Sequence, residues 1–294
     1  MTARAWLLFI LSSVIWGVPY FFIKIAVDGG VPPGFVAWAR VALGAALVLP
    51  LAARRGALRG LRGRTGAILG YTACEIAVPF VLIATGEQYI SSSLTAILIA
   101  TMPLMVALLS IRFAPDHQPT GLRVVGLVIG LGGVVALLGI DVGGRPNELL
   151  GAALVLVATL GYAAAPIIVD RRLADLDPLG PVAASLAVAT VALLPAAVLQ
   201  WPHAMPGAVA LGSIALLGLV CTAAGLVVFF QLIAEAGPSR ASVITYINPV
   251  VAVIIGVLLL HEHLGMMSLV GLLLILGGSW LSAGGGADEG KAAR

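Results

Sequence analysis

The sequence predicts an all-α membrane protein with ten transmembrane helices, arranged as two inverted five-helix repeats around a central cavity. Three observations carry this prediction. Hydrophobic residues make up 61% of the 294 residues and charged residues only 10%, whereas soluble domains average about 25% charged residues. The chain contains apolar runs of about 20 residues, the length at which an α-helix crosses a hydrocarbon core. Its two halves also match each other at a fixed offset, the signature of an internal repeat.

The repeat is clearest where polar residues and a proline interrupt an apolar run. The segment SLTAILIATMP ends at Pro103, and the segment SRASVITYINP ends at Pro249, which lies 146 residues later. The same offset relates Trp16 to Tyr162. The expected parts are a first repeat at residues 1–140, a second, inverted repeat at 147–284, and a disordered cytoplasmic tail at 285–294.

Ten apolar runs are long enough to cross a membrane, five in each repeat. The ranges are Ala5–Val27, Gly34–Ala53, Gly66–Gly86, Ser92–Arg112, Thr120–Gly139, Glu148–Val169, Leu179–Gln200, Ala208–Ile233, Ser239–Leu260 and Gly265–Ala283. An odd number of crossings makes the second repeat enter from the opposite side, so the repeats are inverted about an axis in the membrane plane. Many secondary transporters are built in this way, with a substrate site at the repeat interface near mid-membrane.

The basic residues indicate the orientation of the chain. If the N-terminus is cytoplasmic, the loops on that side hold all but three of the 16 Lys and Arg residues. The outer loops hold only Arg145, while Lys24 and Arg40 lie within the membrane. Cytoplasmic loops carry an excess of Lys and Arg in membrane proteins. We therefore expect a multi-pass protein with both termini in the cytoplasm.

Besides Lys24, two charged residues, Glu75 and Arg40, are expected inside the membrane, where a charge must face a watery cavity or a partner. Glu75 lies near the middle of the third range, and Pro79, four residues later, cannot donate to its carbonyl. Glu75 is either a site for a proton or an amine, or a packing residue that is neutral or paired with Arg40. Arg40, in turn, binds Glu75 or a substrate carboxylate, or reaches the headgroups. We assign both residues to the substrate site.

Aromatic residues accompany these charges. Trp16, Tyr20 and Lys24 are spaced four apart and share one broad helix face. Together they could hold the ring and the carboxylate of an amino acid, although Lys24 could instead extend to the membrane surface. Tyr162 occupies the position equivalent to Trp16 in the second repeat. All four are predicted to bind substrate.

A polar cluster surrounds Pro249 in the eighth and ninth ranges. It consists of Gln231, Thr245, Tyr246 and Asn248. The proline leaves the carbonyl of Thr245 without its helical donor. We interpret the cluster as part of the binding site, and polar contacts between helices are the alternative.

Prolines inside the apolar ranges are expected to act as flex points when one bundle moves against the other. They are Pro19, Pro79, Pro103, Pro166 and Pro249. The glycines from Gly126 to Gly133 and from Gly271 to Gly278 indicate close helix packing.

Several of these segments resemble a known family. WGVPYFFIK, the helix with Arg40, SSSLTAILIATMP and GPSRASVITYINP resemble the EamA repeats of the drug/metabolite transporter (DMT) superfamily. The resemblance spans nearly the whole chain and is closest to ten-helix bacterial exporters of amino acids, notably the YddG-type exporter of aromatic amino acids. It implies export across the bacterial inner membrane. The family often has Gly-Glu after the fourth and ninth helices, where this chain has Ala114 to Asp116 and His261 to His263. This departure weakens any role assigned to the carboxylate in these loops.

The sequence and the resemblance together predict a secondary transporter that exports aromatic or large neutral amino acids and related small metabolites by alternating access. A channel-like facilitator is the main alternative, and a membrane-embedded lipid-modifying enzyme is a weaker one, because the short loops supply no convergent acid–base set. No metal and no cofactor are expected, since His261 and His263 lack the i, i+4 spacing of paired ligands. The expected partners are a small-molecule substrate and the lipid bilayer, without nucleic acid, and a monomer is compatible with the sequence.

Overall fold

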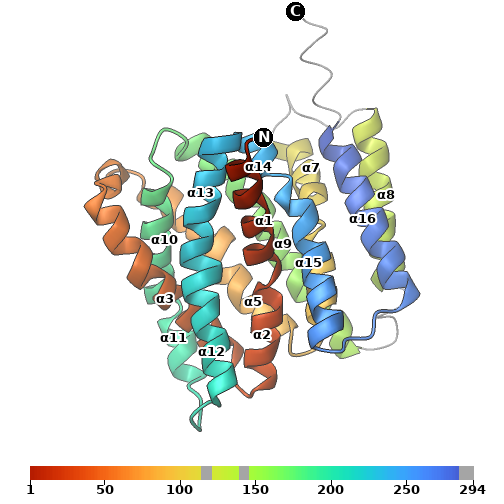
Figure 1. Cartoon of the computed structure of the whole chain (residues 1–294), viewed down its shortest axis with the longest axis horizontal. Helices are drawn as coiled ribbons and strands as arrows, with labels where there is room; N and C mark the ends of the chain where they lie inside the picture. The colour runs from red at the N-terminus through yellow and green to blue at the C-terminus, as the bar shows by residue number, and fades with distance from the viewer. Residues whose placement is uncertain (114–120, 139–145, 285–294) are drawn as a thin grey trace, which may run out of the picture.

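The computed structural model of the chain describes residues 1–113, 121–138 and 146–284, and every regular element within these residues is helical (Figure 1). The tail expected at 285–294 and the loop from Ala114 to Asp116 lie outside the described residues. The elements of the first half are α1 (Ala3–Gly17), α2 (Pro19–Asp28), α3 (Pro33–Arg54), η1 (Ala57–Leu61), α4 (Thr65–Tyr71), η2 (Thr72–Ala77), α5 (Val78–Gly86), α6 (Ser92–Ile99), α7 (Met102–Phe113) and α8 (Leu122–Ala136). Those of the second half are α9 (Pro146–Arg172), α10 (Leu179–Ala192), α11 (Leu194–Leu199), α12 (Ala208–Leu216), η5 (Leu217–Ala224), α13 (Gly225–Ala236), α14 (Pro238–Ala241), α15 (Ile244–Leu259) and α16 (Met266–Gly284).

Seven helical stretches of the described chain are long and apolar enough to cross a membrane. They cover Ala3–Asp28, Pro33–Arg54, Thr65–Gly86, Ser92–Leu109, Pro146–Arg172, Leu179–Leu199 and Ala208–Ala236. Three shorter apolar helices cover Leu122–Ala136, Ile244–Leu259 and Met266–Ser282. Each range expected from the sequence therefore holds an apolar helix, and membrane crossing by the three shorter ones stays a prediction.

Several of the expected ranges are not single regular helices. α1 ends just before Pro19, which begins α2. α6 and α7 are separated at Ala100 and Thr101, immediately ahead of Pro103. Both breaks fall where a proline cannot donate a backbone hydrogen bond to the preceding turn. By contrast, Pro166 and Pro249 lie inside the uninterrupted helices α9 and α15.

α8 and α16 lie side by side at one edge of the bundle (Figure 1). A methyl group added to Gly126 would lie 2.6 Å from the carbonyl oxygen of Gly278. No side chain fits at this distance, so the glycine allows the two backbones to meet. This confirms the interpretation of the glycine-rich stretches as helix packing.

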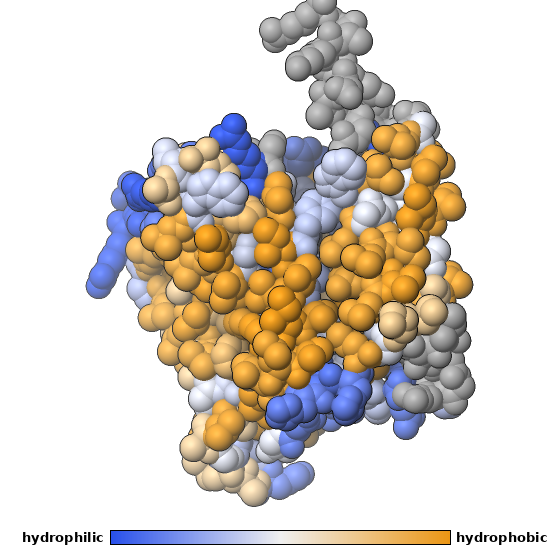
Figure 2. Space-filling view, turned by 45° about the vertical axis from the view of Figure 1, so that its right-hand side comes forward, coloured by the Kyte–Doolittle hydropathy of each residue, from blue (hydrophilic) through white to orange (hydrophobic). Residues whose placement is uncertain are grey.

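Apolar side chains cover the side of the bundle. Figure 2 shows hydrophobic residues over a broad area of this face, with hydrophilic residues gathered toward its two ends. Large apolar side chains such as Val191 (71% exposed) and Leu258 (65% exposed) point outward. Such a surface suits lipid rather than water. We name the end where α1 begins and α16 ends the terminus end, and the opposite end, where α2 gives way to α3, the far end (Figure 1).

Candidate functional site

Two π-helices lie at equivalent places in the two halves of the chain. η2 interrupts the third apolar range and η5 the eighth, and shifting η2 by 146 residues places it inside η5. The N–H of Val78 donates to the carbonyl of Ala73, five residues earlier, and Pro79, which follows, has no N–H to donate. A π-helix inside a longer helix is frequently found at a functional site.

Arg40 (α3) lies inside the bundle beside η5 and α5. Its side chain is buried, with 9% of the residue exposed. The Nε atom donates to Thr222 Oγ1 at 3.0 Å, and the guanidinium carbon lies 4.0 Å from the ring centroid of Phe80. The Thr222 hydroxyl donates in turn to the carbonyl of Leu217 at 2.8 Å. Arg40 is thus held by a π-helix and an aromatic face, and it does not reach the headgroups.

Glu75 (η2) is half-buried and differs from Arg40 in having no protein partner. Among the described residues it makes neither a hydrogen bond nor an ion pair, and in particular it is not paired with Arg40. The hypothesis that Glu75 neutralises Arg40 for packing therefore does not hold in this structure. A membrane carboxyl without a protein partner is available to a proton or to a bound cation.

Two tyrosines lie around Arg40 and Glu75. Tyr162 (α9) is within electrostatic range of Tyr20, Arg40 and Glu75, and Tyr20 (α2) is within range of Arg40. α9 approaches η2 closely at Gly161, where an added methyl group would lie 2.7 Å from a carbonyl oxygen of η2. We call Tyr20, Arg40, Glu75 and Tyr162 the central cluster. It brings a cation, a carboxyl group and two phenol rings together from four segments.

Trp16 (α1) lies against η5 instead of facing Lys24. Its Nε1 donates to the carbonyl of Cys221 at 3.2 Å, and its ring centroid is 4.5 Å from that of Phe229. The N–H of Trp16 is therefore already used within the protein. The aromatic stripe expected from the sequence divides, with Trp16 at η5 and Tyr20 in the central cluster.

Lys24 (α2) lies at the far end. Its Nζ donates to the backbone carbonyl of Glu87 at 2.8 Å and forms an ion pair with Asp28 at 3.2 Å. Both contacts draw the ammonium toward the end of the helix. This placement agrees with the alternative in which Lys24 extends to the membrane surface.

Glu262 links the two halves at the far end. Its carboxylate accepts hydrogen bonds from Ser92 N (2.7 Å), Ser92 Oγ (2.8 Å), Ser93 N (3.0 Å) and Ser93 Oγ. Ser92 and Ser93 begin α6, and the first N–H groups of a helix lack partners within it and favour a negative charge. We call these bonds the Glu262–α6 contact. Although this chain departs here from the family's Gly-Glu, the carboxylate of Glu262 joins the two halves in the structure.

The turn before Glu262 directs it toward α6. His261 has a φ of 53°, in the left-handed region that few residues other than glycine adopt. The N–H of Glu262 donates to the carbonyl of Gly256 at 3.2 Å, which turns the chain back over the end of α15. Because an Oε atom of Glu262 would lie 2.4 Å from a methyl group at Gly256, the glycine also leaves room for the carboxylate.

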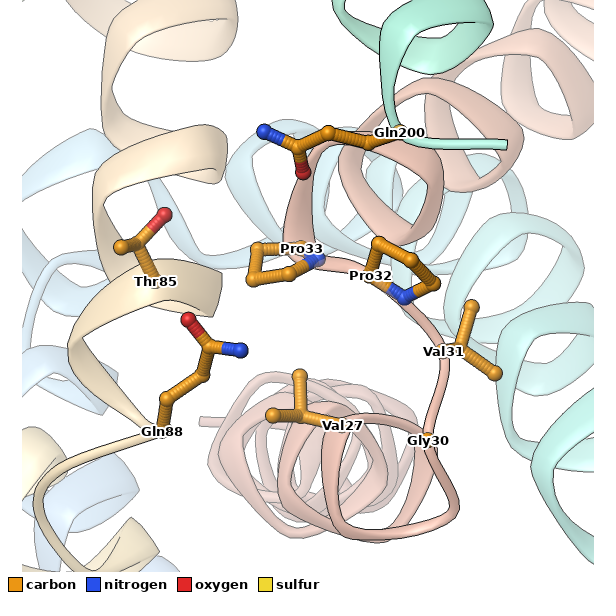
Figure 3. A pocket seen from close by; sticks show the side chains of 8 residues that line it. All are labelled: Val27, Gly30, Val31, Pro32, Pro33, Thr85, Gln88 and Gln200. Carbon is orange, nitrogen blue, oxygen red and sulfur yellow. The ribbon is translucent and has the colours of Figure 1, made fainter. Parts of the chain in front are cut away.

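A cavity of about 380 Å³ opens at the far end. Its lining residues are Val27, Gly30, Val31, Pro32, Pro33, Thr85, Gln88 and Gln200 (Figure 3). Figure 3 shows the amides of Gln88 and Gln200 on opposite sides of Pro33. Gln200 Oε1 accepts from the N–H of Gly34 at 2.8 Å and so ties α11 to the start of α3. None of the four residues of the central cluster lines this cavity.

The comparisons with known proteins agree with these features. The profile of the EamA-like transporter family matches residues 3–139 and 149–284. The chain belongs to the EamA-like transporter family. It is 28% identical over 252 residues to YedA of Escherichia coli K12, described as an uncharacterized inner membrane transporter, with 83% of this chain and 78% of YedA covered. It is 27% identical over 284 residues to YoaV of Bacillus subtilis, described as an uncharacterized transporter, with 92% and 93% covered.

A solved crystal structure shares the fold. It covers 98% of this chain and is itself fully covered, with a TM-score of 0.69 and 18% sequence identity. The family establishes this EamA-like protein as a multi-pass membrane transporter. The relatives' names give no substrate, so the YddG-type resemblance informs a proposal only.

The polar cluster around Pro249 of this transporter makes contacts between helices. Tyr246 Oη donates to the carbonyl of Ser279 on α16 at 3.4 Å. The amide nitrogen of Asn248, with the amide oriented toward acceptors, lies 3.2 Å from the carbonyl of Ser13 on α1. Gln231 is exposed on α13, and Thr245 is half-buried. Within the described residues, none of the four forms a hydrogen bond with the central cluster.

Three features of the site were not anticipated from the sequence. They are the two π-helices, the Arg40 contacts with Phe80 and Thr222, and the burial of Glu87. Pro79 was the available signal for η2, because it removes a helical donor. For η5, the internal repeat was the available signal. Cys221 is equivalent to Glu75, 146 residues earlier, so a π-helix at Glu75 predicts one at Cys221.

Proposed function

We propose that this protein is a secondary transporter that exports aromatic or large neutral amino acids across the bacterial inner membrane by alternating access. In this proposal ten helices form two inverted repeats, and the terminus end faces the cytoplasm, in accord with the excess of basic residues in the loops at that end. The outward direction and the amino-acid class come from the family resemblance. The central cluster is the binding site.

The composition of the central cluster is the observation that carries the proposal. An amino acid is a zwitterion, so its site needs a cation for the carboxylate and an anion for the ammonium. Arg40 suits the carboxylate because its planar guanidinium offers paired donors, of which Nε is bound to Thr222. Glu75 suits the ammonium because it has no partner in the described chain. The rings of Tyr20 and Tyr162 supply apolar surface for a large side chain.

The two ends of the bundle are closed by contacts of different kinds. At the far end, the Glu262–α6 contact and the bond from Gly34 N to Gln200 join segments that are distant in sequence. At the terminus end, Arg64 pairs with Asp175 at 2.7 Å, with both side chains exposed. Exposed ion pairs contribute about 0–1 kcal/mol. Alternating access requires each end to open in turn, which would break these contacts at one end at a time.

Counterflow in proteoliposomes tests this function. Purified protein is reconstituted into vesicles loaded with unlabelled amino acid, and uptake of trace labelled phenylalanine, leucine, lysine and glutamate is followed. We expect saturable counterflow of phenylalanine and leucine above that of lysine and glutamate. A flux that does not saturate would favour the channel-like facilitator. Counterflow absent for all four amino acids would reject the proposed substrate class.

A further inference from the structure

Glu87 is a buried acidic residue without a partner. It directly follows α5 and is 0% exposed, and neither of its carboxyl oxygens has a hydrogen-bond partner within the described part of the protein. The hydroxyl of Thr95 donates to the Ser91 carbonyl at 3.0 Å. Lys24 binds the backbone carbonyl of Glu87. An ionised carboxylate buried without hydrogen bonds is costly, so this environment favours the protonated form of Glu87.

The groups around Glu87 come from three segments and include one ammonium and two carboxyl groups. Lys24 and Asp28, with the phenol of Tyr20, face it from α2, Thr95 from α6, and Glu262 from the turn after α15. Burial raises the pKa of the Glu87 carboxyl well above its usual range, the charge of Lys24 opposes this, and the carboxylates of Glu262 and Asp28 add to it.

Glu262 is held in place by contacts with the start of α6. Its two oxygens accept four hydrogen bonds, two of them from backbone N–H groups that can only donate. Its carboxylate oxygens are therefore held as acceptors near Glu87. A negative charge on Glu87 would be repelled by them within a poorly solvated region.

We propose that Glu87 is a proton-binding site of this transporter and that release of its proton opens the far end by weakening the Glu262–α6 contact. The step is Glu87–COOH giving Glu87–COO⁻ and a proton that leaves to water at the far end. The ammonium of Lys24, already at the Glu87 backbone, then exchanges its ion pair with Asp28 for one with the new carboxylate. Repulsion between Glu87 and Glu262 loosens the start of α6.

The shifted pKa of Glu87 sets the direction in which closure of the far end depends on pH. Because the folded protein raises the pKa of Glu87, it binds this proton more tightly than the unfolded chain. The stability of the closed far end is therefore complete at low pH and is lost as pH rises through the raised pKa. One linked proton changes the open-to-closed ratio by at most about tenfold per pH unit. Coupling of this proton to export rests on the proposed function, whereas proton binding by Glu87 does not.

A reporter cysteine at the far end tests the proposal without substrate. Cys74 and Cys221 are replaced by alanine, and Ile90, which is 4% exposed, is changed to Cys. Labelling of Ile90→Cys by a membrane-impermeant maleimide in proteoliposomes is measured from about pH 5 to 9, a range that brackets a raised carboxyl pKa. Tyr89→Cys, at an exposed neighbouring position, corrects for the pH dependence of the thiol itself.

The corrected rate should rise with pH in the protein with native Glu87 and stay low and flat in Glu87→Gln. Asp28→Asn removes a second carboxylate beside Lys24 that also raises the pKa of Glu87, so the rise should persist in this variant but shift to lower pH. An unchanged rise in Glu87→Gln would overturn the proposal. Glu87→Met, which also suits a buried position without a partner, is the second variant if the Gln protein does not fold.

Infrared difference spectroscopy reports the proton itself. The carbonyl band of a protonated carboxyl group should be present near neutral pH, should decrease as pH is raised, and should be missing in Glu87→Gln. Glu75→Gln identifies any contribution from Glu75. A band unaffected by Glu87→Gln would contradict proton binding at this site.

The labelling and counterflow experiments separate the two proposals. A pH-dependent opening without amino-acid counterflow would reject the proposed function alone, and counterflow with a pH-independent far end would reject the proton site alone.

Discussion

The two π-helices occupy equivalent places in the chain but are used differently. In η5, the carbonyl of Cys221 accepts a hydrogen bond from Trp16, and the hydroxyl of Thr222 accepts one from Arg40. In η2, the carboxyl group of Glu75 has no partner among the described residues. The carbonyl and hydroxyl groups of η5 thus have side-chain partners, and the carboxyl group of η2 has none within the described chain.

In the proposed function, this difference separates a supporting segment, η5, from a binding segment, η2. η5 fixes the position of Arg40, and Trp16 fills the space beside it. In η2 the π-helix widens the backbone at Glu75, and the described residues provide no hydrogen-bond partner for the Glu75 carboxyl group. A protein gains no stability from an unpaired carboxyl group within a membrane, because such a group is costly unless it has a partner or a function. We infer that the same backbone feature serves positioning in one half and ligand binding in the other.

Replacement of Arg40 should have the largest effect on transport. Arg40→Met removes the proposed carboxylate partner, and a hydrogen bond to a charged group contributes about 1.5–3 kcal/mol. The substrate concentration for half-maximal counterflow should rise at least about tenfold. Arg40→Lys, which keeps the charge but not the planar donor pair, should recover part of the loss. An unchanged concentration in Arg40→Met would show that the site lies elsewhere.

Replacement of Thr222 should have an intermediate effect that appears in stability first. Thr222→Val preserves the shape but removes the acceptor for Arg40 and the donor to Leu217. The free energy of unfolding should fall by about 1–3 kcal/mol, because the bond to a charged group is lost. Thr222→Ser keeps the hydroxyl and serves as the control in thermal unfolding. Equal stability of Thr222→Val and Thr222→Ser would argue against η5 as the support of Arg40.

Replacement of Trp16 should have the smallest effect and separates packing from binding. Trp16→Phe loses the bond to the Cys221 carbonyl but keeps an aromatic ring near Phe229. Stability should decrease by about 0.5–1.5 kcal/mol while the preference among amino acids stays unchanged. The reverse pattern, with altered selectivity at constant stability, would restore the sequence-based hypothesis that Trp16 contacts substrate. Thermal unfolding and competition counterflow measure the two quantities.

The sequence predicted the helices well because hydrophobicity in a membrane is a strong and local signal. Each expected range holds an apolar helix, and the glycines of α8 and α16 pack as expected. It also selected Tyr20, Arg40, Glu75 and Tyr162, because polar and charged groups are rare within apolar runs. The structure brings these four close together, and their role as a binding site stays a prediction.

Other features depend on packing that no single segment specifies. A π-helix differs from an α-helix by one extra residue in the hydrogen-bonded ring, and η5 contains no proline to indicate it. Glu87 stands at the end of an apolar run, where a solvated position is the usual expectation. Its burial arises from segments that meet only in the folded chain. The Glu262–α6 contact likewise joins residues 169 and 170 positions apart.

Glu75→Gln, assayed for both counterflow and thermal unfolding, tests the central claim most directly. The substitution keeps the shape of the side chain and removes its charge. We predict that counterflow falls at least about tenfold, since a charged hydrogen bond to the substrate ammonium is lost, while the melting temperature holds or rises. Unchanged counterflow would contradict a binding role for η2. A fall in stability of about 3–5 kcal/mol would instead show that Glu75 neutralises a buried cation after all.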